Sequence, residues 1–301
     1  MALWDGVDEN ARIKHVEPLG DLSSTQRLFR TQAALRELHG DRVTVLAMGE
    51  LALPFRAVLA ENNDLDYVAL SDAWRSAPGQ RLLQDARRTR DARDKTSRRL
   101  GILGSRIASS RSPRIHPQPF DRLELPDDTD VVALLPQLHP HYAGFAVTSP
   151  FKRTAARAVG ADMPAVNTLV RLRNGWKGAN TDVEGARVAL RKLPDGPLTV
   201  LGNGGAADAI RAAFPERDIR VVRRAEVGVV SGVVVWTWPA HVAPPDGLRF
   251  DHATVGVIAY GPPAWSIAAD VRARGGTPRM LGPAWFVAQA RAQRRLWSEA
   301  A

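Results

Sequence analysis

The stretch LTVLGNGGAADAIRAAF, residues 198–214, joins a short apolar run to a helical pattern through a glycine-rich turn. This order predicts a strand, a tight loop and a helix. Glycines at such a junction let the backbone approach a pyrophosphate, and the helix N-terminus adds free N–H groups and a partial positive charge. Because plain βα turns also contain glycine, the motif alone leaves a purely structural turn open. The predicted nucleotide loop consists of Gly202, Asn203, Gly204, Gly205 and Ala206.

The next predicted strand ends in VVRRAE, residues 221–226, about 20 residues after the glycines. Sites that take NAD usually carry an acid near this point, which binds the ribose 2′-hydroxyl. Here Arg223 and Arg224 stand at the strand end and suit a 2′-phosphate, so we expect NADP rather than NAD. Glu226 lies close enough in the sequence to leave NAD open.

Strands and helices alternate along the rest of the chain, which predicts βα units and parallel sheets. Before residue 85, strands are expected at 12–17, 42–48 and 66–71, and helices at 23–38 and 52–62. After residue 99, strands are expected at 100–105, 143–149, 219–222, 228–238 and 253–260, and helices at 152–159, 183–193, 266–276 and 282–297. Residues 167–182 predict a hairpin that turns at Asn174-Gly175, because Asn-Gly accommodates positive φ angles.

Composition limits the class of protein. The chain has 301 residues, of which 45% are hydrophobic and 24% charged, as is typical of a soluble globular protein. Apolar runs fall short of the roughly 18 residues of a membrane-spanning helix, and the N-terminus lacks the layout of a signal peptide. Cysteine is absent, which excludes disulfides, thiolate catalysis and cysteine-based zinc sites. We therefore expect a cytoplasmic protein with no metal and no membrane partner.

The formal net charge of +9 indicates anionic partners. Much of this charge lies in residues 85–100, where Asp85, Asp91 and Asp94 interrupt the arginines and aromatic side chains are absent. This composition is typical of a solvated helix or a linker. Since neither stacking aromatics nor a recognised reader motif accompanies the charge, we expect small anions such as phosphates and carboxylates, and no nucleic acid.

A second motif, FAVTSPFKRTAARAV at residues 145–159, places Lys152 behind a Thr-Ser-Pro turn at the start of a predicted helix. Lysines at such junctions are mostly solvated surface charges. Asp182 precedes another predicted helix and, taken alone, would cap it. A lysine beside a carboxylate and partly shielded from water can instead be tuned to transfer a proton. The residues by themselves leave both interpretations open.

Further motifs accompany these two, and together they make residues 101–299 resemble shikimate dehydrogenase. The motifs are SSRSPRIH (109–116), VTSPFK (147–152), AVNTLV (165–170), GANTDVEG (178–185), LGNGGAA (201–207) and GPAWFVAQA (282–290). The resemblance implies a two-domain α/β fold with an active-site cleft between the domains. It also implies reversible, NADP-dependent reduction of 3-dehydroshikimate to shikimate in aromatic amino acid (chorismate) biosynthesis.

The resemblance implies a role for each matching residue. Lys152 corresponds to the proton carrier, and Asp182 to the partner that positions it and binds a substrate hydroxyl. The expected ligands of the substrate carboxylate are Ser110, Ser112 and Tyr260, and those of the ring hydroxyls are Thr148, Asn167 and Gln289. In isolation the serines would stabilise a loop and Asn167 would cap a turn.

Several positions depart from the family pattern. Ala146 stands where an asparagine usually contacts substrate, Ser109 replaces a common histidine, and Val257 replaces a frequent aspartate. The chain from residue 115 to residue 126 is short, as though the first helix of the substrate domain were missing.

Two further departures involve tryptophan. The stretch VWTWPA, residues 235–240, replaces asparagine-alanine-threonine beside the nicotinamide, and Trp285-Phe286 replaces a methionine–leucine pair.

The departures leave two alternatives open. One is a quinate/shikimate dehydrogenase-like enzyme of other specificity, and the other is a non-catalytic remnant that binds a nucleotide or a partner.

The first 100 residues resemble a second family, the last three βα units of type I 3-dehydroquinate dehydratase, as in a bifunctional dehydratase–dehydrogenase fusion. The motifs are IKHVEPLGDLSSTQRLFR (13–30), LAMGELALPFRAVL (46–59) and SAPGQ (76–80). This resemblance matches Lys14 to the Schiff-base lysine and Arg56 to the arginine that binds the substrate carboxylate. It matches Ser76 and Gln80 to residues of the closing loop.

The match lacks the first five strands of that barrel and its catalytic histidine, and three βα units cannot close an eight-stranded barrel. His15 follows Lys14 directly and would point to the opposite face of the strand. We therefore expect no dehydratase activity from this chain. Exposed strand edges would favour a homodimer or docking to a complementary barrel chain.

The sequence thus predicts an α/β chain in four parts. Residues 1–84 are expected to form a partial barrel segment of about three βα units, and residues 85–100 an Arg-rich linker. Residues 101–183 together with 280–301 are expected to form the substrate domain, and residues 184–279 the Rossmann-like NADP domain.

Overall fold

The computed structural model describes residues 8, 10–92, 98–226 and 228–300, and it confirms the α/β class. The chain divides into two compact units. The first comprises residues 1–151 and 171–176, and the second comprises residues 152–170 and 177–301. The four-part domain division inferred from the sequence stays a prediction.

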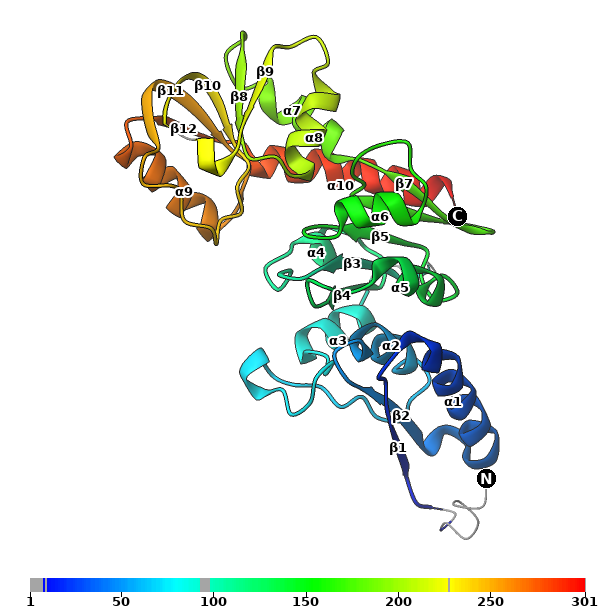
Figure 1. Cartoon of the computed structure of the whole chain (residues 1–301). Helices are drawn as coiled ribbons and strands as arrows, with labels where there is room; N and C mark the ends of the chain where they lie inside the picture. Colours follow the sequence, from blue (N-terminus) through cyan, green and yellow to red (C-terminus); the bar gives the residue numbers. More distant parts are fainter. Residues whose placement is uncertain (1–7, 9, 93–97, 227, 301) are drawn as a thin grey trace. The chain divides into compact units, whose positions relative to one another are not determined.

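The first unit begins with a small parallel sheet (Figure 1). β1 (Ile13–Pro18) pairs along its whole length with β2 (Val43–Met48), and α1 (Thr25–His39) forms the crossover between them. α2 (Ala52–Leu59) follows β2 and is buried throughout. The sequence indicates this arrangement, because β2 is a short, mostly apolar run and α1 has helical apolar spacing, whereas β1 contains charged residues and buries only Ile13.

Residues 66–71, predicted as a third strand, do not form one. The segment has an isolated bridge between Ala69 and Leu82. Among the described residues no further strand lies beside it to complete a ladder, so its backbone groups find other partners. The carbonyl of Tyr67 accepts a hydrogen bond from Arg56 Nη2 at 2.9 Å. The segment therefore contains two strands and not three complete βα units.

A five-stranded sheet follows, with the strand order β4-β3-β5-β6-β7. Its strands are β3 (Leu100–Gly104), β4 (Phe120–Glu124), β5 (Gly144–Val147), β6 (Thr168–Leu172) and β7 (Gly175–Ala179). β3 is buried over its whole length and pairs in parallel with β4 and β5. The turn between β6 and β7 occupies residues 173–174, one position earlier than predicted, and Gly175 opens β7 with a φ of 124°.

The connection from β3 to β4 is short and contains α4 (Ser112–Ile115), a single turn. After β4, α5 (Val131–Leu138) is capped by Asp130, whose carboxylate accepts hydrogen bonds from the amides of Val132 and Ala133. α4 contacts β4, and two helices of the N-terminal segment contact this strand as well. α2 and α3 (Leu83–Arg90) both contact β4. The Arg-rich stretch therefore begins as a helix packed on this sheet.

A buried ion cluster joins the N-terminal segment to β4. Asp121 is 2% exposed and pairs with Arg99, which also binds Glu61 with 2.5 Å between Nη2 and Oε1. The Tyr142 hydroxyl donates to Asp121 at 3.1 Å, and Arg81 lies 3.6 Å from the same carboxylate. Burial acts to raise the pKa of Asp121, but the positive charges of Arg99 and Arg81 outweigh it and hold this pKa below its ordinary value.

The second unit contains a parallel sheet in the order β12-β11-β10-β8-β9. Its strands are β8 (Leu198–Leu201), β9 (Ile219–Val222), β10 (Val229–Trp236), β11 (Arg249–Val257) and β12 (Thr277–Met280), the last of which was not predicted. In chain order the sheet reads 2-1-3-4-5, so its winding reverses between β8 and β10. In sheets of this kind ligands bind beyond the carboxyl ends of the strands at that reversal.

The helices of the second unit are α6 (Lys152–Ala158), α7 (Asp182–Leu190), α8 (Gly205–Ala213), α9 (Pro262–Ala273) and α10 (Gly282–Glu299). Val233 and Val235 of β10 belong to a core with α7 and α8, whereas Val234 and Trp236 belong to a second core with α9. The two cores arise because alternate residues of a strand point to opposite faces. In the part of the chain that the structure describes, no helix combines the length and apolar character needed to cross a membrane.

Replacing Asp121 with asparagine should destabilise the first unit strongly. The change leaves Arg99 and Arg81 buried without their shared countercharge, and breaking a buried ion pair typically costs about 3–5 kcal/mol. The matched control is Asp127→Asn, which breaks an exposed pair with Arg106 at 3.5 Å and should cost less than about 1 kcal/mol. Urea unfolding at neutral pH followed by circular dichroism would measure both free energies.

The difference between the unchanged chain and Asp121→Asn should also depend on pH. The folded-state pKa of Asp121 is depressed, so its stabilisation is fully present above the unfolded-state pKa of about 3.9 and is lost as the pH falls below it. The gap in unfolding free energy should therefore hold down to about pH 4 and narrow as the pH falls from there to about pH 2. A gap that stays constant over this range would contradict the assignment.

Candidate active site

Lys152 and Asp182 form an ion pair in the second unit. Lys152 is the first residue of α6 and Asp182 the first residue of α7, and their Nζ and Oδ2 atoms lie 2.5 Å apart. Their side chains are 18% and 8% exposed, so the pair is largely shielded from water while part of the lysine remains accessible. An amine held in this way against a carboxylate can exchange a proton with a group that reaches it.

The second carboxylate oxygen of Asp182 is held by a residue whose role the sequence reasoning missed. Trp285 donates its indole Nε1–H to Asp182 Oδ1 at 2.9 Å and is itself buried. The indole lies so close to Gly185 that a Cβ there would meet Trp285 Cδ1 at 2.8 Å. In the sequence Trp285 was noted as a departure from a family pattern; in the structure it fixes the orientation of the carboxylate.

Asn167 organises the chain just before Asp182. Its Oδ1 accepts hydrogen bonds from the Thr181 amide at 2.7 Å and from the hydroxyls of Thr181 and Thr168 at 3.0 and 2.8 Å. Its Nδ2 donates to Gln289 Oε1 at 3.3 Å. The structure therefore brings two of the predicted hydroxyl-binding residues, Asn167 and Gln289, into contact. Their predicted role toward a substrate stays a prediction.

The glycine loop lies beyond the carboxyl end of β8, at the reversal of the sheet. Gly202 has a φ of 119°, and a Cβ there would meet Thr237 Oγ1 at 2.6 Å, so both backbone conformation and space require glycine. Gly204 precedes α8 and has open space where a Cβ would stand. A Cβ at Gly205 would meet Lys152 Cδ at 3.0 Å. The loop therefore packs directly against the side chain of Lys152.

A second ion pair fixes this loop relative to α6. Asp208 of α8 is buried and binds Arg153 through Nη2 at 2.9 Å and Arg211 at 2.6 Å. Arg153 also donates to the carbonyl of Asn203 at 3.0 Å. Sequence reasoning did not single out Arg153 or Asp208, since an arginine next to Lys152 and an acid within a helix have no distinctive pattern.

The residues expected to choose between cofactors follow β9. The amide of Gly202 donates to the carbonyl of Val222 at 3.0 Å, which brings the end of β9 next to the glycine loop. Arg223 and Arg224 follow Val222 and are exposed. The Glu226 carboxylate accepts the backbone amide of Arg223 at 3.1 Å, so this acid is engaged with the local turn.

Tyr260, the third expected ligand of a carboxylate, lies after β11 and is partly buried. Its ring contacts Phe286 of α10 with 5.1 Å between centroids. Val257, noted for replacing an aspartate, is fully buried in the core against α9. Trp236 of the VWTWPA stretch belongs to the same core, and Trp238 packs against it. These departures therefore contribute apolar packing.

The other predicted substrate ligands lie in the first unit. The hydroxyls of Ser110 and Ser112 are 3.4 Å apart, and the Ser110 hydroxyl accepts the amide of Ser112 at 3.3 Å. The amide of Thr148 donates to the carbonyl of Leu103 at 2.9 Å. Ala146 is buried within β5. The side chains of Ser110 and Ser112 thus lie close together. Their predicted role in binding a substrate carboxylate stays a prediction.

Three of the residues that were matched to a dehydratase from the sequence, Lys14, Arg56 and Gln80, lie near Tyr67 in the first unit. Lys14 Nζ lies 4.0 Å from the centre of the Tyr67 ring. Arg56 is buried and donates to the Tyr67 carbonyl, and burial lowers its pKa. The amide of Ser76 donates to Gln80 Oε1 at 2.8 Å. The Arg56 guanidinium therefore binds the backbone of residue 67, which is what a structural role requires.

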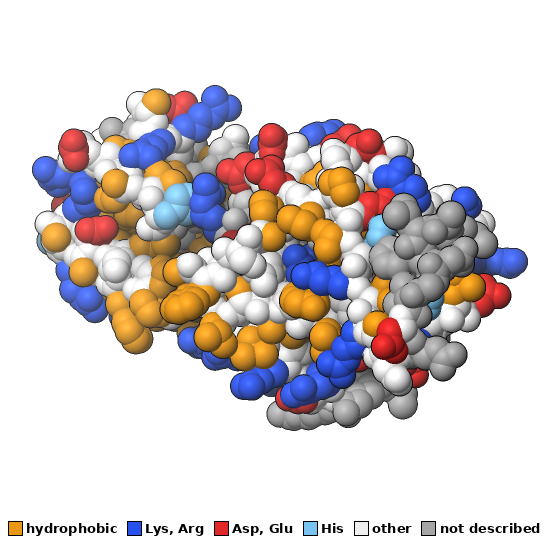
Figure 2. Space-filling view, turned by 90° about the horizontal axis from the view of Figure 1, so that it is seen from below, with side chains coloured by type: hydrophobic (Ala, Val, Ile, Leu, Met, Phe, Trp, Pro, Cys, Tyr) orange, Lys and Arg blue, Asp and Glu red, His pale blue; other side chains and the backbone are white. Residues whose placement is uncertain are grey.

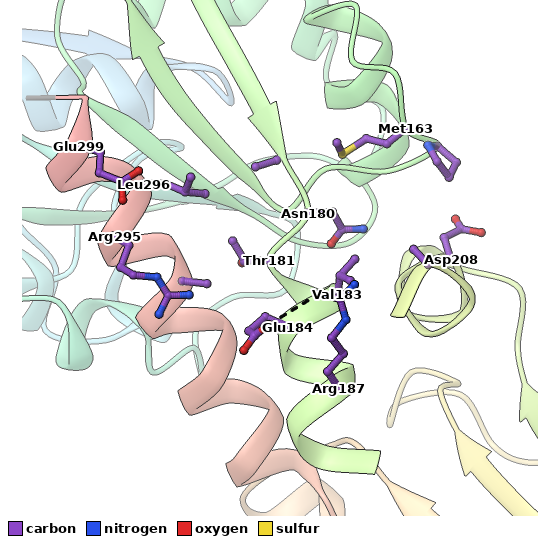
Figure 3. A pocket seen from close by; sticks show the side chains of 14 residues that line it. Met163, Asn180, Thr181, Val183, Glu184, Arg187, Asp208, Arg295, Leu296 and Glu299 are labelled. Carbon is purple, nitrogen blue, oxygen red and sulfur yellow. Dashed lines mark ion pairs between the residues drawn. The ribbon is translucent and has the colours of Figure 1, made fainter. Parts of the chain in front are cut away.

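A pocket of about 420 Å³ lies elsewhere in the second unit, among α7, α8 and α10 (Figure 3). Glu184 and Arg187 face each other along one wall, with 4.0 Å between their charged atoms. Thr181 lines the pocket, but Lys152 and Asp182 do not. We therefore identify the candidate site by the lysine–carboxylate pair and not by this pocket. No group of three histidine or acidic side chains in the described ranges is arranged to hold a metal ion.

Several known proteins are similar to parts of this chain. No family model matches the chain. It is 32% identical to the NADP(+)-dependent shikimate dehydrogenase of Anaeromyxobacter sp. (strain Fw109-5) in an alignment of 176 positions, and the match covers 49% of this chain and 62% of the relative. A second such relative, from Chlorobium phaeobacteroides, is matched over 46% of its length. The chain thus spans about half to three-fifths of the curated relatives that it matches.

Solved structures show that the fold is shared with shikimate dehydrogenases. Shikimate dehydrogenase 1 from Peptoclostridium difficile superposes with a TM-score of 0.55 and 20% identity, covering 68% of this chain and 93% of that chain. Shikimate 5-dehydrogenase from Thermus thermophilus, solved with NADP(H) and shikimate, gives a TM-score of 0.52 and 21% identity, covering 67% and 94%. At these identities the likeness concerns the fold.

Replacing Trp285 with phenylalanine should test the hydrogen bond to Asp182. The variant keeps an aromatic ring but loses the donor, and a hydrogen bond to a charged group contributes about 1.5–3 kcal/mol. The matched control is Trp265→Phe, because Trp265 is 68% exposed and its replacement should change the unfolding free energy by less than about 0.5 kcal/mol. Urea unfolding measures both. Equal losses in the two variants would show that Asp182 gains nothing from the indole.

Proposed function

We propose that this chain is an NADP-dependent dehydrogenase that reversibly reduces 3-dehydroshikimate to shikimate in aromatic amino acid biosynthesis. The observation that carries the proposal is the shielded Lys152–Asp182 pair, which packs against the glycine loop through Gly205. A proton carrier and a nucleotide-binding turn are the two parts that oxidation of a secondary alcohol requires. The named relatives and the shared fold support the proposal.

The proposed chemistry moves one proton and one hydride. NADP(H), when bound by the glycine loop, would supply or accept the hydride at the carbon that carries the reacting oxygen. In the reducing direction the Lys152 ammonium donates a proton to that oxygen as the carbonyl becomes a hydroxyl, and in the oxidising direction the neutral amine accepts it. Asp182 orients the amine through Oδ2 while Trp285 holds Oδ1. The Lys152 amine is then held in one preferred position for proton transfer.

The residues present fit a dinucleotide phosphate cofactor. The positive φ of Gly202, the open space at Gly204 and the start of α8 provide a close backbone approach and free N–H groups for a pyrophosphate. The exposed Arg223 and Arg224 supply positive charge for a 2′-phosphate. These features support NADP as the cofactor, with NAD as the alternative.

Further elements of the proposal concern the substrate and the first 84 residues. Ser110, Ser112 and Tyr260 are proposed to bind the substrate carboxylate, and quinate or a related ring acid is the alternative substrate. We infer that the dehydratase-like segment is inactive, since Arg56 is committed to the Tyr67 carbonyl. A borohydride trap for an imine at Lys14 would test this inference.

Association with another chain is proposed through the N-terminal segment. The segment exposes several large hydrophobic side chains, namely Val16, Met48, Leu65, Tyr67, Leu70 and Trp74. Figure 2, seen from below the view of Figure 1, shows hydrophobic side chains gathered at the surface. Exposed apolar patches and strand edges favour a homodimer or docking to a complementary barrel chain. Sedimentation velocity would distinguish these states, and a cytoplasmic location stays a prediction.

Lys152→Ala should lower the rate of NADP reduction by shikimate by a factor of about 10² or more, the contribution of a positioned acid–base group. Absorbance of the reduced nicotinamide measures the rate. The matched control is Lys192→Ala, since Lys192 is an exposed lysine of the same unit and its loss should leave the rate unchanged. A folded parent that binds NADP but turns over neither shikimate nor quinate would favour the non-catalytic alternative.

Replacing both Arg223 and Arg224 with alanine should raise the KM for NADP by about 10-fold or more and leave the KM for NAD unchanged. The expected size follows from the loss of charge-assisted bonds to a phosphate, of about 1.5–3 kcal/mol. Arg220→Ala serves as the control, because Arg220 is an exposed arginine of β9, the strand that precedes Arg223 and Arg224. A variant that loses affinity for both cofactors equally would contradict the assignment to the 2′-phosphate.

A further inference from the structure

Two side chains of β4 hold the loop that carries Ser110. Arg122 donates from Nη2 to the carbonyl of Ser110 at 2.8 Å. Glu124 accepts the amide of Ile107 on Oε1 at 3.3 Å. Residues 122 and 124 lie two apart on a strand and so share a face. The loop is therefore fastened at two points to one side of β4.

Arg122 is in turn held by the N-terminal segment. Its Nη1 binds the carboxylate of Asp85 on α3, and the two side chains are 8% and 15% exposed. A guanidinium has a rigid planar fork of donors, so fixing one amino group on a carboxylate fixes the direction of the other. The second amino group is the one that contacts Ser110. The orientation of the Ser110 carbonyl therefore depends on an acid 25 residues earlier in the sequence.

The positions of both serine hydroxyls depend on this stretch of backbone. The Ser110 hydroxyl accepts the amide of Ser112 and lies 3.4 Å from the Ser112 hydroxyl. A rotation of the peptide that carries the Ser110 carbonyl would therefore move the two donors together. Small displacements of donors weaken a charged hydrogen bond steeply, because its strength depends on distance and angle.

We propose that Asp85 and Arg122 are positioning residues that hold the Ser110–Ser112 loop in the geometry for binding a carboxylate. The proposal rests on the proposed function of these serines and adds a role for the N-terminal segment. α3 belongs to a stretch whose composition is typical of a solvated linker. In this proposal it supports substrate binding indirectly, because its residue Asp85 orients Arg122.

The test compares four variants of the full chain. Asp85→Asn and Arg122→Gln remove the charge pair, Asp85→Glu retains the carboxylate, and Arg88→Gln removes a different partner of Asp85, 3.2 Å away, that is more exposed. We expect the KM for shikimate to rise by about 10-fold in the first two, corresponding to the loss of one charge-assisted bond. The affinity for NADP, measured by calorimetry, should stay unchanged. Asp85→Glu should retain much of the parental KM, and Arg88→Gln should match the parent.

Amide hydrogen exchange provides a readout that does not depend on turnover. Exchange at residues 107–112 should quicken in Asp85→Asn relative to Arg88→Gln, while exchange in α9 stays the same. An active parent with an unchanged KM and unchanged exchange in Asp85→Asn would overturn the positioning role alone. A parent that neither binds nor oxidises shikimate, with the expected change in exchange, would overturn the proposed function but retain the structural dependence on Asp85.

Discussion

The buried carboxylate of Asp121 determines how the N-terminal segment packs against the following sheet. An unpaired buried charge is so costly that its partners become obligatory. Here Arg99 and Tyr142 belong to the sheet region, whereas Arg81 comes from the segment before it. Glu61 extends the cluster through Arg99. The segment from β1 to α3 is therefore joined to the sheet by charge pairing as well as by the contacts of α2 and α3 with β4.

Much of the fold could be predicted because periodicity and turn chemistry are local properties. The strand, glycine turn and helix of residues 198–213 have the predicted order. Residues 66–71 were predicted wrongly because strand formation needs a neighbouring ladder, and local composition does not reveal whether one exists. β12 was missed because its four residues, Thr-Pro-Arg-Met, lack an apolar pattern and are fixed by pairing with β11.

The candidate site was predictable to the extent that its residues belong to motifs. Lys152 and Asp182 were expected to pair, and the structure joins them across 30 positions. Trp285 was not expected to hold Asp182, because the contact spans 103 positions and depends on the space above Gly185. Arg153 and Asp208 were missed for a similar reason. A contact between distant residues of ordinary type is set by packing, which a single sequence does not encode locally.

The same physics explains why a segment without a complete barrel is still an integral part of the chain. α4 is a single turn that contacts β4, and α2 and α3 of the segment contact the same strand. Removing the segment would take Asp85 from Arg122 and Arg81 from Asp121, and it would also uncover the part of β4 that α2 and α3 contact. The segment is therefore needed for structure whether or not it performs any chemistry.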